Sequence, residues 1–249
     1  MVTSIIQKSQ LEGANRLDAE YYQPEYLQVK QTLLDLRSVP LSEIITRPVV
    51  TGSTPMIREP KMDGTDIKFI KTDVVRDGTI NFDSADLLPL RADKKNSRPQ
   101  DGNILVTIIG ASYEIVGRSA RVFFDDPKMN INQNIALIRP DISIFSSYLE
   151  TFLRSKFGRD QLWQQSRQTE QVNLNCREVE NILVPLLSSK FQQEIDGLIF
   201  KARELKSEAL KIYKQAENSL LEELGLADFK ISDDLTFVAN LSDVKSANR

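Results

Sequence analysis

The feature that most constrains this chain is a long apolar repeat between Pro185 and Gly225. Apolar or small side chains recur there at alternating spacings of three and four residues, namely at Ile195, Leu198, Ala202, Leu205, Ala209, Ile212 and Ala216. This spacing is a heptad seam with apolar a and d positions. Neither Pro nor Gly interrupts residues 198–224. The pattern therefore predicts one helix over 187–225, roughly 50 Å long at 1.5 Å per residue.

Such a seam has two interpretations. Most apolar helix stripes are ordinary core packing, but here only the preceding domain and a short tail, 226–249, could cover so long a helix. Three of the four a positions are Ala, which allows close approach of a partner helix. We therefore expect the seven seam residues to form a dimerisation surface, with the partner helix in a second chain or in a second copy of the same unit.

Residues 1–186 predict a globular, mixed α+β domain. Residues 24–36 show helical spacing, with one face formed by Tyr26, Val29, Leu33 and Leu36. Short apolar runs between turn signals follow over about 40–140 and indicate strands, including a hairpin at Asp77-Gly78. Helix is expected again at SSYLETFLRSKFG. Two capping boxes are predicted, one from Ser147 and Glu150 and one from Ser189 and Gln192.

The two ends of the chain share a short sequence. LEGANR at 11–16 returns as VKSANR at 244–249. A match this short can arise by chance. The alternative is a duplicated domain, with tail 226–249 as the start of the second copy.

Composition argues against an enzyme. The chain of 249 residues has no His and one Cys, Cys176, and its formal net charge is -3. These counts exclude His-based catalysis and Cys-cluster zinc sites, and we expect no catalytic or metal site. Asp101 with Asp126 and Lys128 loosely resembles nuclease spacing, but acidic pairs of this kind are frequent. The lone Cys and the absence of a long apolar run predict a soluble, cytoplasmic protein without membrane contact.

Several segments, in this order, resemble one half of the specificity subunit of type I restriction-modification systems. They are ANRLDAEYYQPEY (14–26), TGSTP (51–55), DGNILVTIIGASYEIVGRSA (101–120), NQNIALIRP (132–140), SYLETFLRS (147–155) and QVNLNCREVENILVPLLSSKFQQEID (171–196). Each motif alone is weak, but the ordered set covers nearly the whole chain.

The resemblance implies a non-catalytic reader of one half of a split double-stranded DNA target. It also implies that two long helices pair antiparallel as a spacer, in a homodimer if this chain is a half subunit. Methyltransferase subunits and restriction subunits would join this scaffold. The chain itself would need no cofactor, because S-adenosylmethionine, ATP and Mg would be held by those partners.

Candidate DNA contacts are chosen by side-chain chemistry, since Arg, Asn and Gln read base edges while cations, hydroxyls and backbone N–H groups bind phosphate. One loop supplies Arg47, Thr51, Gly52, Ser53 and Thr54, unless it is a plain turn. The basic run RADKKNSR supplies Arg91, Lys94, Lys95 and Arg98, unless it is only a solvated loop.

Two further loops complete the candidates. The turn after ILVTIIG offers Ser112, Tyr113 and Arg118. A polar loop offers Ser166, Arg167, Gln168, Thr169 and Gln171. The amides of Asn132, Gln133 and Asn134 are instead expected to bond backbone. The alternative to a DNA reader is a coiled-coil interaction module whose globular domain binds no DNA.

Overall fold

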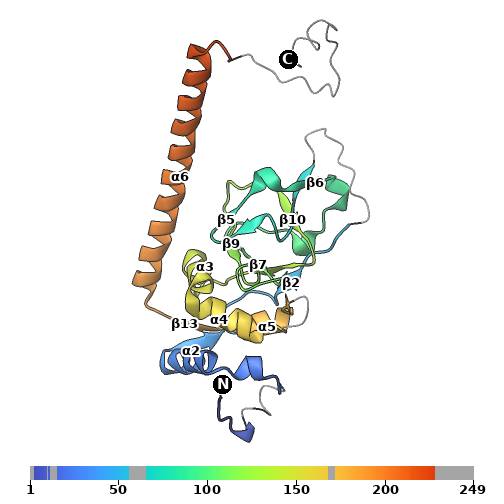
Figure 1. Cartoon of the computed structure of the whole chain (residues 1–249), viewed down its shortest axis with the longest axis vertical. Coiled ribbons are helices and arrows are strands. Elements are labelled where there is room, and N and C mark those ends of the chain that lie inside the picture. The colour runs from blue at the N-terminus through green and yellow to red at the C-terminus, as the bar shows by residue number, and fades with distance from the viewer. Residues whose placement is uncertain (1–2, 10, 12–15, 56–65, 168–171, 228–249) are drawn as a thin grey trace, which may run out of the picture. The chain divides into compact units, whose positions relative to one another are not determined.

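The computed structural model describes residues 3–9, 11, 16–55, 66–167 and 172–227 (Figure 1). The chain divides into two compact units, Met1–Ile199 and Phe200–Arg249. The first unit has the predicted α+β architecture, and a single long helix runs from it into the second. Most of the tail and most of the repeated Ala-Asn-Arg residues lie outside the described residues.

Among the described residues, η1 and α2 come first, short strands and 3-10 helices follow, and the remaining α-helices lie toward the C-terminus. The α-helices are α2 (Pro24–Asp35), α3 (Ser146–Arg154), α4 (Lys156–Gln165), α5 (Cys176–Glu180) and α6 (Ser189–Glu223). The 3-10 helices are η1 (Ala19–Tyr22), η2 (Leu41–Glu43), η3 (Phe82–Ser84), η4 (Leu90–Ala92) and η5 (Lys95–Ser97). The strands are β1 (Ser38–Pro40), β2 (Val50–Thr51), β3 (Ile67–Ile70), β4 (Val75–Arg76), β5 (Thr79–Ile80), β6 (Asp86–Leu88), β7 (Ile104–Thr107), β8 (Ile109–Gly110), β9 (Ser119–Arg121), β10 (Met129–Ile131), β11 (Ile135–Ile138), β12 (Val172–Asn173) and β13 (Leu183–Pro185).

A four-stranded antiparallel sheet, ordered β2-β11-β7-β9, lies between two hydrophobic cores. Successive side chains of a strand point to opposite faces, and β11 shows this clearly. Ala136 and Ile138 join the core beneath the helices, whereas Ile135 and Leu137 join the second core. The predicted strands in DGNILVTIIG and NIALIRP are therefore confirmed, and they form the centre of this sheet.

A second sheet carries the only parallel strand pair among the described residues. Its order is β10-β3-β6, and β10 runs parallel to β3 with Asn130 opposite Phe69. Further antiparallel pairs join β4 to β5, β8 to β12 and β1 to β13. In the predicted hairpin β4–β5, Gly78 has φ of 77°, which confirms the Asp77-Gly78 turn.

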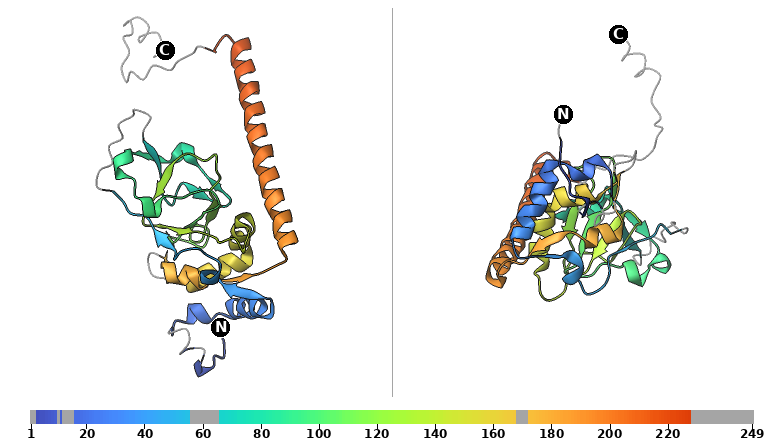
Figure 2. Two further views of the ribbon diagram at one scale, coloured as in Figure 1. Left: turned by 180° about the vertical axis from the view of Figure 1, so that it is seen from behind. Right: turned by 90° about the horizontal axis from the view of Figure 1, so that it is seen from below.

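The helices α2, α4 and α5 lie together, next to the β1–β13 pair (Figures 1 and 2). In α2, Tyr26, Val29 and Leu33 are buried as predicted, but Leu36 follows the helix and is exposed. The segment SSYLETFLRSKFG forms two helices instead of one, because Ser155 is extended and caps α4 through a bond from the Gly158 amide.

Both predicted capping boxes are wrong. Phe145, not a polar residue, precedes α3, and Glu150 is buried instead of capping. At α6, the Ser188 hydroxyl accepts from the Phe191 amide, while the Gln192 side chain bonds the Phe145 amide and the Leu187 carbonyl. A capping box does form at α5, where Asn175 and Glu178 exchange side-chain to backbone bonds of 2.9 and 2.7 Å.

The long helix α6 is confirmed, at 35 residues or roughly 52 Å. It ends as predicted at Gly225, which has φ of 68°. The Gly225 amide bonds the Glu222 carbonyl and the Leu226 amide bonds the Leu221 carbonyl. This pair of bonds is a Schellman motif, which satisfies the last carbonyls of a helix and stops it.

Candidate nucleic-acid interface

Strand β10 and the turn after it hold two of the predicted DNA-contact loops side by side. The loop at 51–54 lies against the backbone of Ile131 and Asn132, and the loop at 93–98 is bonded to Asn130. These loops are about forty residues apart in the sequence, and the sequence of neither loop indicates that they lie close together in the fold.

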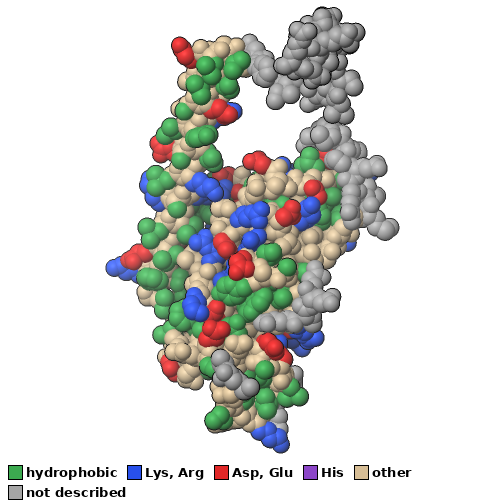
Figure 3. Space-filling model, viewed as in Figure 1, with side chains coloured by type: hydrophobic (Ala, Val, Ile, Leu, Met, Phe, Trp, Pro, Cys, Tyr) green, Lys and Arg blue, Asp and Glu red, His purple; other side chains and the backbone are tan. Residues whose placement is uncertain are grey.

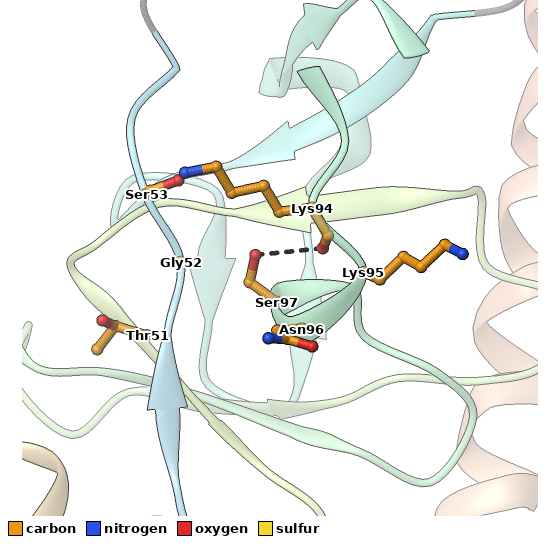
Figure 4. Close-up of a pocket in the computed structure, with 7 residues that line it drawn as sticks. All are labelled: Thr51, Gly52, Ser53, Lys94, Lys95, Asn96 and Ser97. Carbon is orange, nitrogen blue, oxygen red and sulfur yellow. Dashed lines mark hydrogen bonds between the residues drawn. The ribbon is translucent and has the colours of Figure 1, made fainter. Parts of the chain in front are cut away.

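The first loop depends on a close backbone approach at Gly52. Its amide donates to the Asn132 carbonyl at 3.0 Å. A Cβ at this position would lie 1.7 Å from the Ile131 carbonyl oxygen, so no other residue fits without displacing the loop. Thr54 donates its hydroxyl to the side-chain oxygen of Gln133. The loop is thus fixed in place, with Thr51 and Ser53 on either side of Gly52 (Figure 4).

The second loop is fixed by the buried amide of Asn130. The Asn130 side-chain nitrogen donates to Asp93 Oδ1 at 2.7 Å and to the Lys94 carbonyl at 3.0 Å, and its oxygen accepts from Ser97 Oγ at 2.7 Å. Asp93 also pairs with Arg98. The basic run is therefore an ordered loop, and Lys94, Lys95 and Asn96 are exposed along it.

The two loops line an open hollow of about 460 Å³ (Figure 4). Its walls are Thr51, Gly52, Ser53, Lys94, Lys95, Asn96 and Ser97. In Figure 4 the Lys94 side chain extends toward Ser53, and the dashed line joins Ser97 to the Lys94 carbonyl. Lys94 and the Ser53 side chain approach each other across the hollow, whereas the Lys95 side chain extends the other way from the same loop. Hydroxyls, backbone N–H groups and ammonium groups of this kind are the donors that a phosphate diester accepts.

A second hollow of about 390 Å³ shares Lys95 with the first. It is lined by Thr46, Arg47, Lys95, Arg98, Gln100, Asn103, Arg139 and Pro140. We call the residues around both hollows the basic face. Four of the eight residues lining the second hollow are cationic and none of these eight is acidic, although Arg98 is paired with Asp93 from outside.

Arg139 is a member of the basic face that the sequence did not single out. It follows β11, and its guanidinium donates to the Asn96 carbonyl at 2.5 Å, which ties it to the basic loop. Burial, and next the positive charge of Arg47, lower the pKa of Arg139. Cations crowded in this way favour an anion between them. The sequence signal that could have identified Arg139 is its position directly after a predicted strand and before Pro140.

The predicted residues Ser112, Tyr113 and Arg118 do not line this face. The Tyr113 hydroxyl donates to Asp160 at 2.8 Å, and its ring packs edge-on against Trp163 with centroids 5.7 Å apart. Burial raises its pKa, followed by the bond to Asp160. Arg118 donates to the Glu114 carbonyl at 2.6 Å. Tyr113 is thus a packing residue, while Ser112 and Arg118 are partly exposed on the same turn.

The polar loop after α4 is only partly described. Ser166 is 1% exposed and donates to the Trp163 carbonyl, so its hydroxyl faces the interior. Arg167 is exposed, with its guanidinium 3.7 Å from Glu178. Gln168, Thr169 and Gln171 lie outside the described residues. Arg91, in η4, is exposed but lines neither hollow.

The amide cluster at 132–134 has the expected structural role in part. Asn132 is buried, and its side-chain oxygen accepts from the Asn134 amide at 3.0 Å. Within the described ranges, no group of three or more Cys, Asp or Glu side chains is placed to hold a metal ion. No described helix has the length and apolar character to cross a bilayer.

A comparison with known proteins finds sequence similarity to a restriction-system subunit. The chain is 28% identical over 186 residues to the type I restriction enzyme EcoBI specificity subunit of Escherichia coli, a match that covers 72% of this chain and 38% of that protein. No family model matches. The chain is a homologue of type I restriction-modification specificity subunits, and it spans roughly half of such a subunit or less.

One solved structure supports the fold. The type IIG restriction endonuclease BpuSI aligns with TM-score 0.51 at 10% identity, covering 80% of this chain and 30% of that one. The HsdS subunit from Thermoanaerobacter tengcongensis aligns with TM-score 0.47 at 18% identity, covering 88% of this chain and 53% of that one.

Proposed function

We propose that this homologue of type I specificity subunits reads one half of a split DNA target through its basic face. The observation that carries the proposal is the convergence of two separate loops on β10. Both loops were chosen as DNA contacts for their side-chain chemistry, once the resemblance had implied a DNA reader. They line one hollow together, and Lys95 of the second loop also lines the adjoining one.

The basic face offers both kinds of DNA contact. Lys94 and Lys95, with the Thr51 and Ser53 hydroxyls, suit the phosphate backbone. Arg47 and Arg139 suit bidentate contacts to guanine, and the amides of Asn96 and Gln100 suit adenine edges. The overall charge of -3 gives no general attraction to DNA, so affinity has to come from this local patch and should fall with salt.

We infer that the chain is not itself an enzyme. Methyl transfer and cleavage would belong to methyltransferase and restriction subunits that assemble with it in the cytoplasm and hold S-adenosylmethionine, ATP and Mg. The EcoBI relative supports this role by its name as a specificity subunit. The lack of any His in the sequence points in the same direction.

Helix α6 would provide the scaffold by pairing with the same helix of a second copy. Its seam residues Leu198, Leu205 and Ile212 are 65%, 52% and 58% exposed. Figure 3 shows apolar side chains along the helix. An exposed apolar stripe of this length is stable in water when a partner helix covers it. A two-fold dimer would present two basic faces to the halves of a symmetric target.

A gel-shift experiment with duplexes that contain two random segments separated by spacers of varied length tests the proposal. We expect salt-sensitive retention and selection of one split sequence with one spacer. A chain that retains no duplex at low salt would instead be the interaction module considered above.

A further inference from the structure

The α6 seam is complementary to itself in one particular register. We propose that two copies of α6 pair antiparallel with their two-fold axis between residues 203 and 204, so that Lys201 of each copy faces Glu208 of the other. This inference rests on the proposed antiparallel pairing with a second copy and adds the register of that pairing.

Side-chain size favours the antiparallel direction. In this direction an a position lies opposite a d position, which places Leu198 opposite the partner's Ala209 and Leu205 opposite the partner's Ala202. The next layers place Ile195 opposite the partner's Ile212 and Phe191 opposite the partner's Ala216. Ile195 also packs against the core of its own domain, and the Phe191 ring lies edge-on to Tyr148. Each layer holds one large and one small side chain or two of medium size, as even packing requires.

A parallel pair would pack unevenly. Each a and each d position would then face itself, so Ala202, Ala209 and Ala216 would form thin layers between wide layers of Leu198 and Leu205. Thin layers leave cavities. A parallel pair would also place Lys201 beside the partner's Lys206, which adds like-charge repulsion.

Charge selects the register. In an antiparallel pair, the residue just before an a position on one helix lies across the seam from the residue just before an a position on the other helix. In the proposed register Lys201 meets the partner's Glu208 twice, by symmetry, and Glu194 meets the uncharged Gln215. A slide by one heptad in one direction sets Glu208 against the partner's Glu208. A slide in the other direction sets Lys201 against the partner's Lys201. Within α6, Lys201 lies 3.6 Å from Glu204, but both are exposed and such a pair is weak.

An apolar groove at the start of α6 continues the seam. It has a volume of about 270 Å³, and its lining includes Phe191, Ile195, Leu36, Phe157 and Leu187. Ile195 is the first seam residue and Phe191 lies four residues before it. Leu36, Phe157 and Leu187 are each at least 40% exposed. In the proposed register, the partner's Ala216 and Leu220 run past this groove. The partner helix would thereby also cover exposed apolar side chains that lie outside the seam.

Cysteine pairs in the full chain test the register. In a Cys176→Ser background, L198C and A209C chains carrying different tags are made separately, mixed and oxidised. We expect a disulfide between the two chains in the mixture and none in either chain alone, because identical positions would lie about 16 Å apart, beyond the roughly 7 Å that a disulfide spans. Self-crosslinking of A209C would indicate a parallel pair. Crosslinking of A209C to L205C in place of L198C would indicate a shifted register. Either result overturns the proposal.

Charge reversal gives a second measurement. Lys201→Glu should raise the dimer dissociation constant about 10-fold, because both symmetric contacts become repulsive, and adding Glu208→Lys should restore it. Lys211→Glu, on the opposite side of the helix, is the matched control and should change little. Failure of the double variant to recover would refute the register.

Sedimentation and gel shifts of the parent chain distinguish the proposed register from the proposed DNA-reading function. A dimer that retains DNA without these crosslinks refutes the register alone, and a monomer that retains DNA refutes the pairing but not the DNA role.

Discussion

The side-chain nitrogen of Asn130 lies 2.7 Å from Asp93 Oδ1, and this bond joins strand β10 to the basic loop. Asn130 is nearly fully buried and also bonds the Lys94 carbonyl and the Ser97 hydroxyl. A single core amide thus determines where Lys94 and Lys95 lie relative to the loop at 51–54.

Asn130→Ala should loosen the basic loop. The substitution leaves buried partners of the lost amide unsatisfied, at a cost of about 1–3 kcal/mol in the free energy of unfolding. Thermal unfolding measures this loss. DNA affinity should fall as well, while Asn96→Ala, an exposed amide on the same loop, should leave stability unchanged. Equal stability of the Asn130 variant and the parent would contradict the structural role.

Gly52→Ala should displace the other loop, because its new Cβ would lie 1.7 Å from the Ile131 carbonyl oxygen. We expect a loss of roughly 2–4 kcal/mol in unfolding free energy, in the range of other severe backbone changes. The matched control is Gly197→Ala within α6, where a Cβ meets no atom within 4 Å. That change should stabilise the helix by about 0.5–1 kcal/mol. Denaturant titration measures the unfolding free energy of both variants. Similar changes in the two variants would be inconsistent with the close approach at Gly52.

Lys94→Ala and Lys95→Ala should each reduce the steepness with which DNA affinity falls with salt. A lost phosphate contact lowers the slope of log K against log salt by about 1. Fluorescence anisotropy over a salt series measures the slope. Lys30→Ala, an exposed lysine on α2, serves as the control. An unchanged slope in both loop variants would remove these lysines from the DNA contact.

Elements that depend on neighbouring residues could be predicted from the sequence. The heptad spacing and Gly225 defined α6, and Asp77-Gly78 defined the β4–β5 turn, because both depend on neighbouring residues. The capping box predicted from Ser147 and Glu150 was wrong, because both side chains are buried in the core. The meeting of the loops at 51–54 and 93–98 could not be predicted, because it depends on non-local bonds of the first loop to Asn132 and of the second loop to Asn130.

Glu150 should make stability depend on pH. Burial, only partly offset by Arg154, raises its pKa to about 7 from 4.5. The folded state thus favours the protonated form, so this contribution to stability is complete below pH 4.5 and is lost as pH rises through 7. Glu150→Gln should gain up to about 3 kcal/mol relative to the parent at about pH 8 and little at about pH 4. Unfolding curves across this range test the difference, with exposed Glu43→Gln as the control. A constant difference between parent and variant at all pH values would contradict the prediction.

The most direct test of the central claim is the acetylation rate of individual lysines with and without a duplex of the selected split sequence at low salt, measured by mass spectrometry. If the basic face contacts DNA, Lys94 and Lys95 should be strongly protected, while Lys30 on α2 and Lys211 on α6 react at unchanged rates. If DNA is bound and Lys94 and Lys95 still react as they do without it, the DNA contact lies elsewhere and the account is wrong.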